Sequence, residues 1–293
     1  MKTRLDCIPC FFRQALGVAR ATTDDINIHR RVLNEVAGLI PELPLEITPP
    51  EIAQRVYRLT YQITGNNDPY QAEKRKANER ALALYPYLKK TVADSDEPLL
   101  TASKLAIGGN SIDLGPTSRY AAINSIIAPA LADNLSINDY EILCNSINES
   151  RRILYLGDNA GEILFDRILI EEIKQIKDIR VDFVVRESPI INDATMTDAR
   201  YVGLDRVANL ISSGSDAPAT VLSQCSDKIL ELYYAADMII AKGQGNFESL
   251  SEEEGNIFFL LKAKCDVIAK ILEVGIGGAV LKKQTLSLSH SVL

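Results

Sequence analysis

The stretch RRILYLGDNAGE, residues 151–162, sets the architecture of the whole chain. Its apolar run over residues 153–156 is rich in strand formers and stops at a glycine, which is typical of a parallel strand buried on both faces. After Glu162 the apolar residues recur at helical spacing, so the stretch predicts a strand, a tight turn and a helix. Ligands of open parallel sheets bind at the carboxyl ends of strands and at helix N-termini. We therefore expect a ligand at the turn that holds Asp158 and Asn159.

Downstream of this turn the sequence alternates between strand and helix patterns. Further strands are predicted over residues 180–185, 207–211, 238–241 and 257–261, with helices between most of them. One more helix and an edge strand over residues 279–283 end the pattern. Such alternation predicts a parallel sheet with right-handed crossovers.

The first half of the sequence is predicted to be helical. Residues 48–51, Thr-Pro-Pro-Glu, form a capping box with Pro at the first helical position, and Gly65 suits the left-handed end of that helix. Helical spacing continues over residues 122–149. Neither a repeat nor a low-complexity linker is found, so we expect the helical half to pack directly on the sheet.

Composition narrows the class of protein. The protein has 293 residues, 46% of them hydrophobic, which is enough for one large domain or two modest ones. A net charge of −7 without a dense Lys/Arg block argues against a nucleic-acid partner. No window approaches a membrane span and the start does not resemble a signal peptide, so we expect a cytoplasmic protein.

The cysteines and histidines are few. Five cysteines do not suggest a secreted disulfide framework, and only Cys7 and Cys10 are paired in sequence. A single CxxC is weak evidence for a redox or metal pair, and ordinary buried packing explains it equally well. Two histidines leave almost nothing for a His-rich zinc site or a Ser-His-Asp triad.

Polar clusters follow several predicted strands, and topology would bring them to one rim of the sheet. They supply acidic or amide oxygens, a cation and exposed backbone amides, which are the groups that a metal-bound phosphate needs. The oxygens come from Asp158, Asn159 and Asp193, the cation from Lys242, and the amides from Gly161, Ser213 and Gly214.

Each of these residues also has a simpler interpretation. An Asp or Asn beside a Gly is more often a turn former or a helix cap than a metal ligand. Asp193 can cap a helix that begins near residue 194, and Asp198 is more typical of a solvated helix position. Gly243 and Gly245 form a lone G-x-G, a weak sign of dinucleotide binding.

Seven motifs in order resemble the damage-control phosphatase superfamily, in particular its prokaryotic CxxC-containing branch. The resemblance covers nearly the whole sequence. The motifs are Cys7-Ile-Pro-Cys10-Phe with Arg13-Gln14-Ala15-Leu16, Asp68-Pro69-Tyr70 with Lys74 and Asn78, Gly109-Asn110-x-x-Asp113, residues 157–162 (GDNAGE), residues 192–195 (NDAT), residues 213–216 (SGSD) and residues 242–248 (KGQGNFE).

This resemblance implies a helical N-terminal region, residues 1–125, followed by a Rossmann-like three-layer α/β/α domain, residues 126–293, with a mostly parallel sheet. It implies one divalent metal (Mn, Co, Ni or Mg) held by Asp158, Asn159 and Asp193, and hydrolysis of small phosphorylated metabolites such as sugar phosphates. By the same resemblance Asn110 and Asp113 approach the metal and Lys242 contacts phosphate. The expected catalytic residues are Asp158, Asp193, Asp113 and Lys242, and the expected substrate-binding residues are Asn110, Gly161, Glu162, Ser213, Gly214 and Asn246.

Several alternatives stay open on the sequence. The nucleophile is either a water activated near Asp113 or Asp193, or Asp158 itself, and we favour water. A methyltransferase dependent on S-adenosylmethionine also uses a glycine turn after its first strand, but it predicts an acidic ribose ligand where this sequence has Arg186 and then Glu187. A non-catalytic phosphometabolite-binding protein would use the same residues as an enzyme. The sequence also leaves open whether the protein forms an oligomer.

Overall fold

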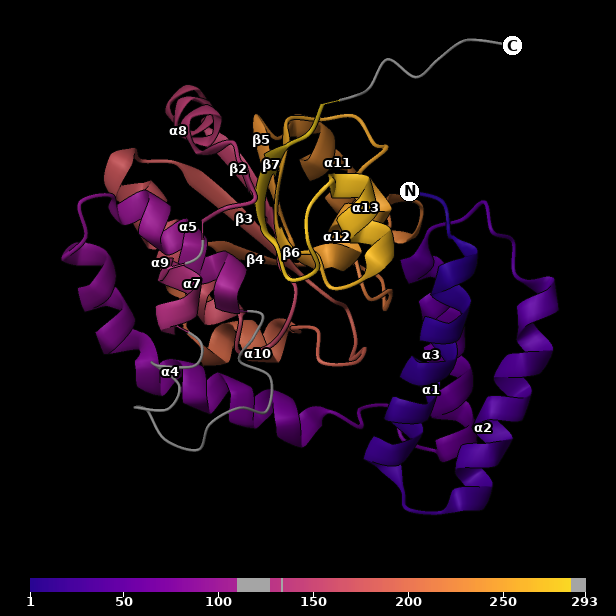
Figure 1. Ribbon diagram of the computed structural model, residues 1–293. Coiled ribbons are helices and arrows are strands. Elements are labelled where there is room, and N and C mark those ends of the chain that lie inside the picture. The colour runs from indigo at the N-terminus through magenta and orange to yellow at the C-terminus, as the bar shows by residue number, and fades with distance from the viewer. Residues whose placement is uncertain (110–126, 133, 286–293) are drawn as a thin grey trace, which may run out of the picture.

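The computed structural model describes residues 1–109, 127–132 and 134–285 (Figure 1). Helices α1–α3 form a bundle beside the sheet, and α4 runs from that bundle to the far side of the molecule (Figure 1). Two predicted site residues, Asn110 and Asp113, lie outside the described residues, and so does the predicted domain boundary at residue 125. None of the described helices combines the length and the apolar character that a bilayer span requires.

The described strands form one seven-stranded, mostly parallel sheet in the order β1-β7-β6-β5-β2-β3-β4. The strands are β1 (Ile137–Asn138), β2 (Arg152–Leu156), β3 (Arg180–Val185), β4 (Asn209–Ser212), β5 (Met238–Lys242), β6 (Ile257–Lys262) and β7 (Ala279–Lys283). The five strands that were predicted from residue 153 to residue 261 are confirmed. The sheet therefore has the expected Rossmann-like character.

One strand prediction was wrong. β7 is not at the edge, because it pairs antiparallel with β6 and parallel with β1, which forms the edge instead. β1 has only two residues and lies in a stretch predicted to be helical. Two residues are too few to show the alternation of apolar and polar side chains that marks a strand, so the sequence pattern could not predict β1.

Helices cover both faces of the sheet and make three layers. On one face α4 (Gln71–Ala93), α5 (Pro98–Gly108), α8 (Tyr140–Glu149), α9 (Ile163–Ile176) and α10 (Met196–Tyr201) contribute to a single apolar core. On the other face α11 (Asp227–Ala235), α12 (Gly243–Leu250) and α13 (Asp266–Leu272) contribute to a second core. Covering both faces explains why β2, β3, β5 and β6 are near-continuous apolar runs.

The N-terminal bundle has its own core. It consists of α1 (Ile8–Thr22), α2 (Ile26–Leu39) and α3 (Pro49–Thr64), whose apolar faces pack on one another. Thr48 and Glu51 form the predicted capping box, and Gly65 ends α3 with a φ of 71°. Ile190, from the loop after β3, is fully buried in this core. The bundle is thereby fastened to the loops at the rim of the sheet.

Strand order reverses between β2 and β5. β2 pairs with β3 on one side and with β5 on the other, all in parallel register. The loops that leave the carboxyl ends of β2 and β5 run to different layers, which opens a crevice between them. In doubly wound sheets this switch point is where ligands bind.

Candidate active site

The turn after β2 docks on the loop after β3. The backbone N–H of Ala194 donates to the carbonyl of Asp158 at 2.8 Å, and the N–H of Ala160 donates to the carbonyl of Asn192 at 2.9 Å. Asn159 and Asp193 form an antiparallel bridge. These contacts bring Asp158, Asn159 and Asp193 together, with side chains that are all nearly buried.

Arg186 fixes the position of Asp193. It directly follows β3, is 1% exposed, and donates from Nε to Asp193 Oδ2 at 2.7 Å. Its other nitrogens donate to the carbonyl of Gly157 and to the hydroxyl of Thr220, both at 3.3 Å. Arg186 therefore ties together the loops that carry the two carboxylates. The sequence offered a signal, because an arginine next to a buried strand end needs a carboxylate partner.

The two simpler interpretations of this loop were wrong. Asp193 does not cap α10, because Thr195 and Asp198 form the capping box of that helix. Asp198 is not a solvated helix residue. It is 7% exposed, and its Oδ1 accepts a hydrogen bond from Asn78 at 2.8 Å.

The three predicted ligands have the chemistry of a divalent-metal site. Asn159 donates from Nδ2 to Asp158 Oδ2 at 2.9 Å and to Glu162 Oε2 at 3.2 Å, so its remaining terminal atom is an oxygen acceptor. Burial raises the pKa of Asp158, and the charges of Glu162 and Asp193 raise it further. Burial likewise raises the pKa of Asp193 in spite of Arg186. A divalent cation would offset this crowding of negative charge.

The donor set fits a hard cation. Among the residues that the structure describes, no three His, Cys, Asp or Glu side chains are grouped to hold a metal. The set is instead two carboxylates and one amide oxygen, which suits Mg²⁺ or Mn²⁺ better than a soft metal.

Gly243 packs directly against Asp158. It follows β5 with a φ of +80°, and a Cβ added to it would lie 2.0 Å from Asp158 Oδ2. A Cβ on Gly245 would lie 2.7 Å from the carbonyl oxygen of Pro218. Close packing accounts for both glycines of the G-x-G, so the pair needs no dinucleotide.

Lys242 does not face the cavity in this structure. Its ammonium is fully buried and donates to Asp166 Oδ1 at 2.7 Å, to the carbonyl of Ala106 at 2.8 Å and to Glu162 Oε1 at 2.9 Å. All three of its donors are thus occupied, and none is left for the predicted phosphate contact. Lys242 orients Glu162, which in turn accepts a hydrogen bond from Asn159.

Gly161, Ser213, Gly214 and Asn246, which were predicted to bind substrate, form hydrogen bonds within the protein. Gly161 donates its N–H to Asn78 Oδ1 at 2.7 Å. Ser213 donates its N–H to the carbonyl of Val185, and Gly214 donates to the hydroxyl of Ser212. Asn246 donates to the carbonyl of Lys242 and accepts from the N–H of Thr220. None of these predicted amide donors lines the cavity that contains Asp158.

That cavity, of about 340 Å³, lies between the rim of the sheet and the helical bundle. It is lined by Asp158, Asn159, Asn192 and Asp193 from the rim, by Cys10, Arg13 and Gln14 of α1, by Ala53 and Tyr57 of α3, and by Cys7, Gln244, Glu248, Lys264 and Cys265.

Two features of the cavity wall were not predicted. Lys264, which follows β6, lines the same cavity as Asp158 and Asp193, and its charge lowers the pKa of both carboxyl groups. Cys7 and Cys10 contribute thiols, and burial raises the pKa of each. A raised pKa is the opposite of what an activated thiolate requires.

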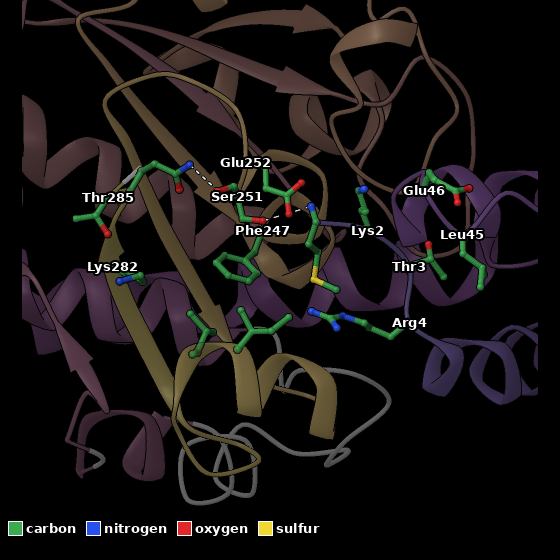
Figure 2. A pocket seen from close by; sticks show the side chains of 14 residues that line it. Lys2, Thr3, Arg4, Leu45, Glu46, Phe247, Ser251, Glu252, Lys282 and Thr285 are labelled. Carbon is green, nitrogen blue, oxygen red and sulfur yellow. Dashed lines mark hydrogen bonds between the residues drawn. The ribbon is translucent and has the colours of Figure 1, made fainter. Parts of the chain in front are cut away.

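A larger cavity, of about 660 Å³, lies beside the N-terminal segment and contains none of the predicted site residues (Figure 2). Its lining combines the ring of Phe247 with charges of both signs, from Lys2, Arg4, Glu46 and Glu252 (Figure 2). It contains neither Asp158 nor Asp193, so the smaller cavity is the candidate active site.

Comparison with known proteins gives the family of this protein. The model of the damage-control phosphatase ARMT1-like domain matches residues 3–280. The protein is 36% identical to the damage-control phosphatase PH1575 of Pyrococcus horikoshii over 98% of this sequence and all of that protein. It is 34% identical to a damage-control phosphatase of Archaeoglobus fulgidus over 96% of this sequence and 99% of that one.

An uncharacterized protein of Methanocaldococcus jannaschii is 37% identical over 97% of this sequence and 96% of that one. The crystal structure of a DUF89 family protein from Pyrococcus horikoshii superposes with a TM-score of 0.91 at 35% identity, covering 97% of this protein and all of that one. The protein belongs to the damage-control phosphatase ARMT1-like domain family.

Proposed function

We propose that this protein is a metal-dependent phosphatase that hydrolyses small phosphorylated metabolites. The observation that carries the proposal is the buried Asp158–Asn159–Asp193 set at the strand switch point, facing a small cavity with Lys264 in its wall. The printed names of two relatives, damage-control phosphatases, support the reaction class. The cavity is of the size that small-molecule ligands occupy.

In this proposal Asp158, Asn159 and Asp193 hold the divalent metal, which acts as a Lewis acid toward a phosphoryl oxygen. Arg186 keeps the Asp193 carboxylate in place, and the Lys242–Glu162 pair does the same for the amide of Asn159. Lys264 is the cation that neutralises the remaining phosphate charge. This assignment moves the phosphate contact from Lys242 to Lys264.

We favour water as the nucleophile over Asp158. Oδ2 of Asp158 accepts a hydrogen bond from Asn159 and lies against the backbone of Gly243. This crowding leaves little room for a phosphoryl group to approach that oxygen in line. A methyltransferase would need an acidic ribose ligand at the end of β3. Arg186 is buried there against Asp193, and the exposed Glu187 accepts a hydrogen bond from the hydroxyl of Ser212, so this alternative gains no support.

The test begins with a phosphatase screen of phosphorylated sugars and cofactor fragments, after chelation and with each divalent metal added back. Asp158→Asn and Asp193→Asn keep side-chain shape but each removes a negative charge from the metal site. Wild type should gain thermal stability from Mn²⁺ by mass action, while both variants should gain little and lose turnover. Asp205→Asn, at an exposed position, is the matched control. Full activity in chelator, or variants that behave like the control, would refute the metal site.

A further inference from the structure

Glu248 places a carboxyl group in the wall of the cavity that holds the candidate metal ligands. It lies on α12, whose first residue, Gly243, packs directly against Asp158. Gln244 and Gly245, four and three residues before Glu248, line the cavity as well. Residues at this spacing share one side of a helix, so the side of α12 that carries Glu248 faces the cavity.

The two oxygens of this carboxyl group have different surroundings. Oε1 accepts a hydrogen bond from Nε2 of Gln244 at 2.8 Å, and the same nitrogen donates to Sγ of Cys265, another residue of the cavity wall, at 3.5 Å. Oε2 has no hydrogen-bond partner in the described part of the chain, and it is not among the unsatisfied atoms that are closed to solvent. Glu248 is half-buried, and Oε2 is therefore its accessible oxygen.

The charge of Glu248 contributes to the raised pKa of Cys7 and Cys10, whose thiols lie on the α1 side of the same cavity. This agrees with a carboxyl group that is directed into the cavity. Among the described residues no Lys or Arg lowers the pKa of Glu248; the hydrogen bond from Gln244 and the amino group of Met1 do so. Burial outweighs both and raises the pKa to about 7. A proton donor is most effective when its pKa lies near the working pH.

Four carboxyl groups of the described residues line this cavity, those of Asp6, Asp158, Asp193 and Glu248. Asp158 and Asp193 are assigned to the metal, and a carboxylate that binds a cation has given up its proton. Asp6 is exposed to solvent in the short segment before α1. Glu248 is thus the carboxyl group of this wall that is both partly shielded from solvent and not needed for the metal.

We infer that Glu248 is the general acid of the reaction, which gives the proton on Oε2 to the oxygen of the departing alcohol. This inference rests on the proposed function. Water forms a new bond to phosphorus, and the bond from phosphorus to the ester oxygen breaks with its electron pair on that oxygen. The proton from Glu248 converts this oxygen into the hydroxyl of the alcohol. The proton that the attacking water loses restores Glu248 through solvent, so the products are the alcohol and inorganic phosphate.

Three esters with different leaving groups test this on the full-length, Mn²⁺-loaded protein: 4-nitrophenyl phosphate, phenyl phosphate and hexyl phosphate. The nitrophenolate ion is stable and departs without a proton, whereas the alkoxide from hexyl phosphate is strongly basic and needs one. Glu248→Gln keeps the shape of the side chain and an oxygen for Gln244, but it has no acidic proton. Glu253→Gln removes the same charge at an exposed position just after α12, outside both cavities, and is the matched control.

Glu248→Gln should lower kcat/KM for hexyl phosphate by about 10²–10⁴-fold, the usual contribution of a general acid. The loss should be smaller for phenyl phosphate, and hydrolysis of 4-nitrophenyl phosphate should change little, which also shows that the variant is folded. Glu253→Gln should leave all three values unchanged. Glu248→Asp keeps an acid on a shorter side chain and should recover part of the activity on hexyl phosphate.

An equal loss on all three esters in Glu248→Gln and Glu248→Asp would assign Glu248 to structure and overturn the inference. Unchanged hydrolysis of hexyl phosphate in Glu248→Gln would overturn it as well. In both cases metal-dependent hydrolysis by wild type leaves the proposed function standing. If wild type hydrolyses none of the three esters with any metal, the proposed function fails, and the inference fails with it.

Discussion

The hydroxyl of Tyr61 accepts the backbone N–H of Ile191 at 3.0 Å, and this bond joins the helical bundle to the loop that carries Asp193. Ile191 has a φ of 39°, in a region that β-branched residues rarely adopt. It lies in a tight turn closed by the N–H of Asp193 donating to the carbonyl of Ile190 at 3.0 Å. Strain of this kind costs about 1–3 kcal/mol and persists only where its surroundings enforce it.

Tyr61→Phe should therefore disturb the metal site through the loop. The change leaves the N–H of Ile191 without its acceptor, which should cost about 1–3 kcal/mol of unfolding free energy. Because Asp193 is two residues further on, the Mn²⁺-induced rise in melting temperature should also shrink. Tyr234→Phe, at a residue that is 74% exposed, should change neither quantity. An unaltered Mn²⁺ response in Tyr61→Phe would show that the loop holds its shape without the bond.

Lys242→Met should lower the stability of the protein, and we do not expect it to act by removing a phosphate contact. The change leaves Glu162 and Asp166 buried without the ammonium that both contact, and breaking a buried ion pair in this way costs about 3–5 kcal/mol. Denaturant unfolding measures the loss, and Lys89→Met, in a partly exposed pair, should cost about 1 kcal/mol or less. Adding Asp166→Asn to Lys242→Met should recover part of the loss. A variant with normal stability and a raised KM would instead restore Lys242 as a phosphate ligand.

Gly243→Ala should impair the metal site through sterics. The new methyl group would lie 2.0 Å from Asp158 Oδ2, and the φ of +80° disfavours any side chain. We expect a strong destabilisation or a displaced Asp158, seen as a weaker Mn²⁺ response in melting curves. Gly17→Ala is the control, because nothing lies within 4 Å of its added methyl group. In the middle of α1 that change should stabilise by about 0.5–1 kcal/mol.

The strands and the predicted metal ligands could be read from the sequence for the same physical reason. A parallel strand covered on both faces must be apolar along its length, so β2 and β3 are visible as continuous runs. Polar residues directly after such runs have to meet at one rim, which is how Asp158 and Asp193 were predicted as neighbours. The structure brings them together with Asn159, as expected.

The direction of Lys242 could not be read in this way. A lysine that ends a strand looks the same in sequence whether it points out of the rim or back under α9. Its direction depends on Glu162 and Asp166, which form a carboxylate pair only when α9 packs on the sheet. Glu248 and Lys264 were missed for a related reason, since their place in one cavity follows from how distant elements dock.

The pH dependence of stability supplies a last test, at Glu248 in the cavity wall. Burial raises its pKa to about 7, although the hydrogen bond from Gln244 and the amino group of Met1 lower it. The charge of Glu248 also contributes to the raised pKa of the Cys7 and Cys10 thiols. Between about pH 4.5 and pH 7 the folded protein therefore keeps a proton that the unfolded protein has released. The stabilisation that this proton gives to the folded protein is complete below about pH 4.5 and is lost as the pH rises through 7.

Glu248→Gln removes this titration while keeping an oxygen that can accept from Gln244. The difference between the unfolding free energies of the variant and of wild type should thus shift in favour of the variant as the pH rises from about 5 to about 8. The total shift should be about 1–3 kcal/mol. The comparison is made in chelator, so that metal binding by Asp158 and Asp193 does not enter the difference. Glu35→Gln, on the exposed face of α2, should give a difference that is flat with pH. A flat difference for Glu248→Gln too, or one that falls with pH, would mean that Glu248 is ionised in the folded protein throughout this range.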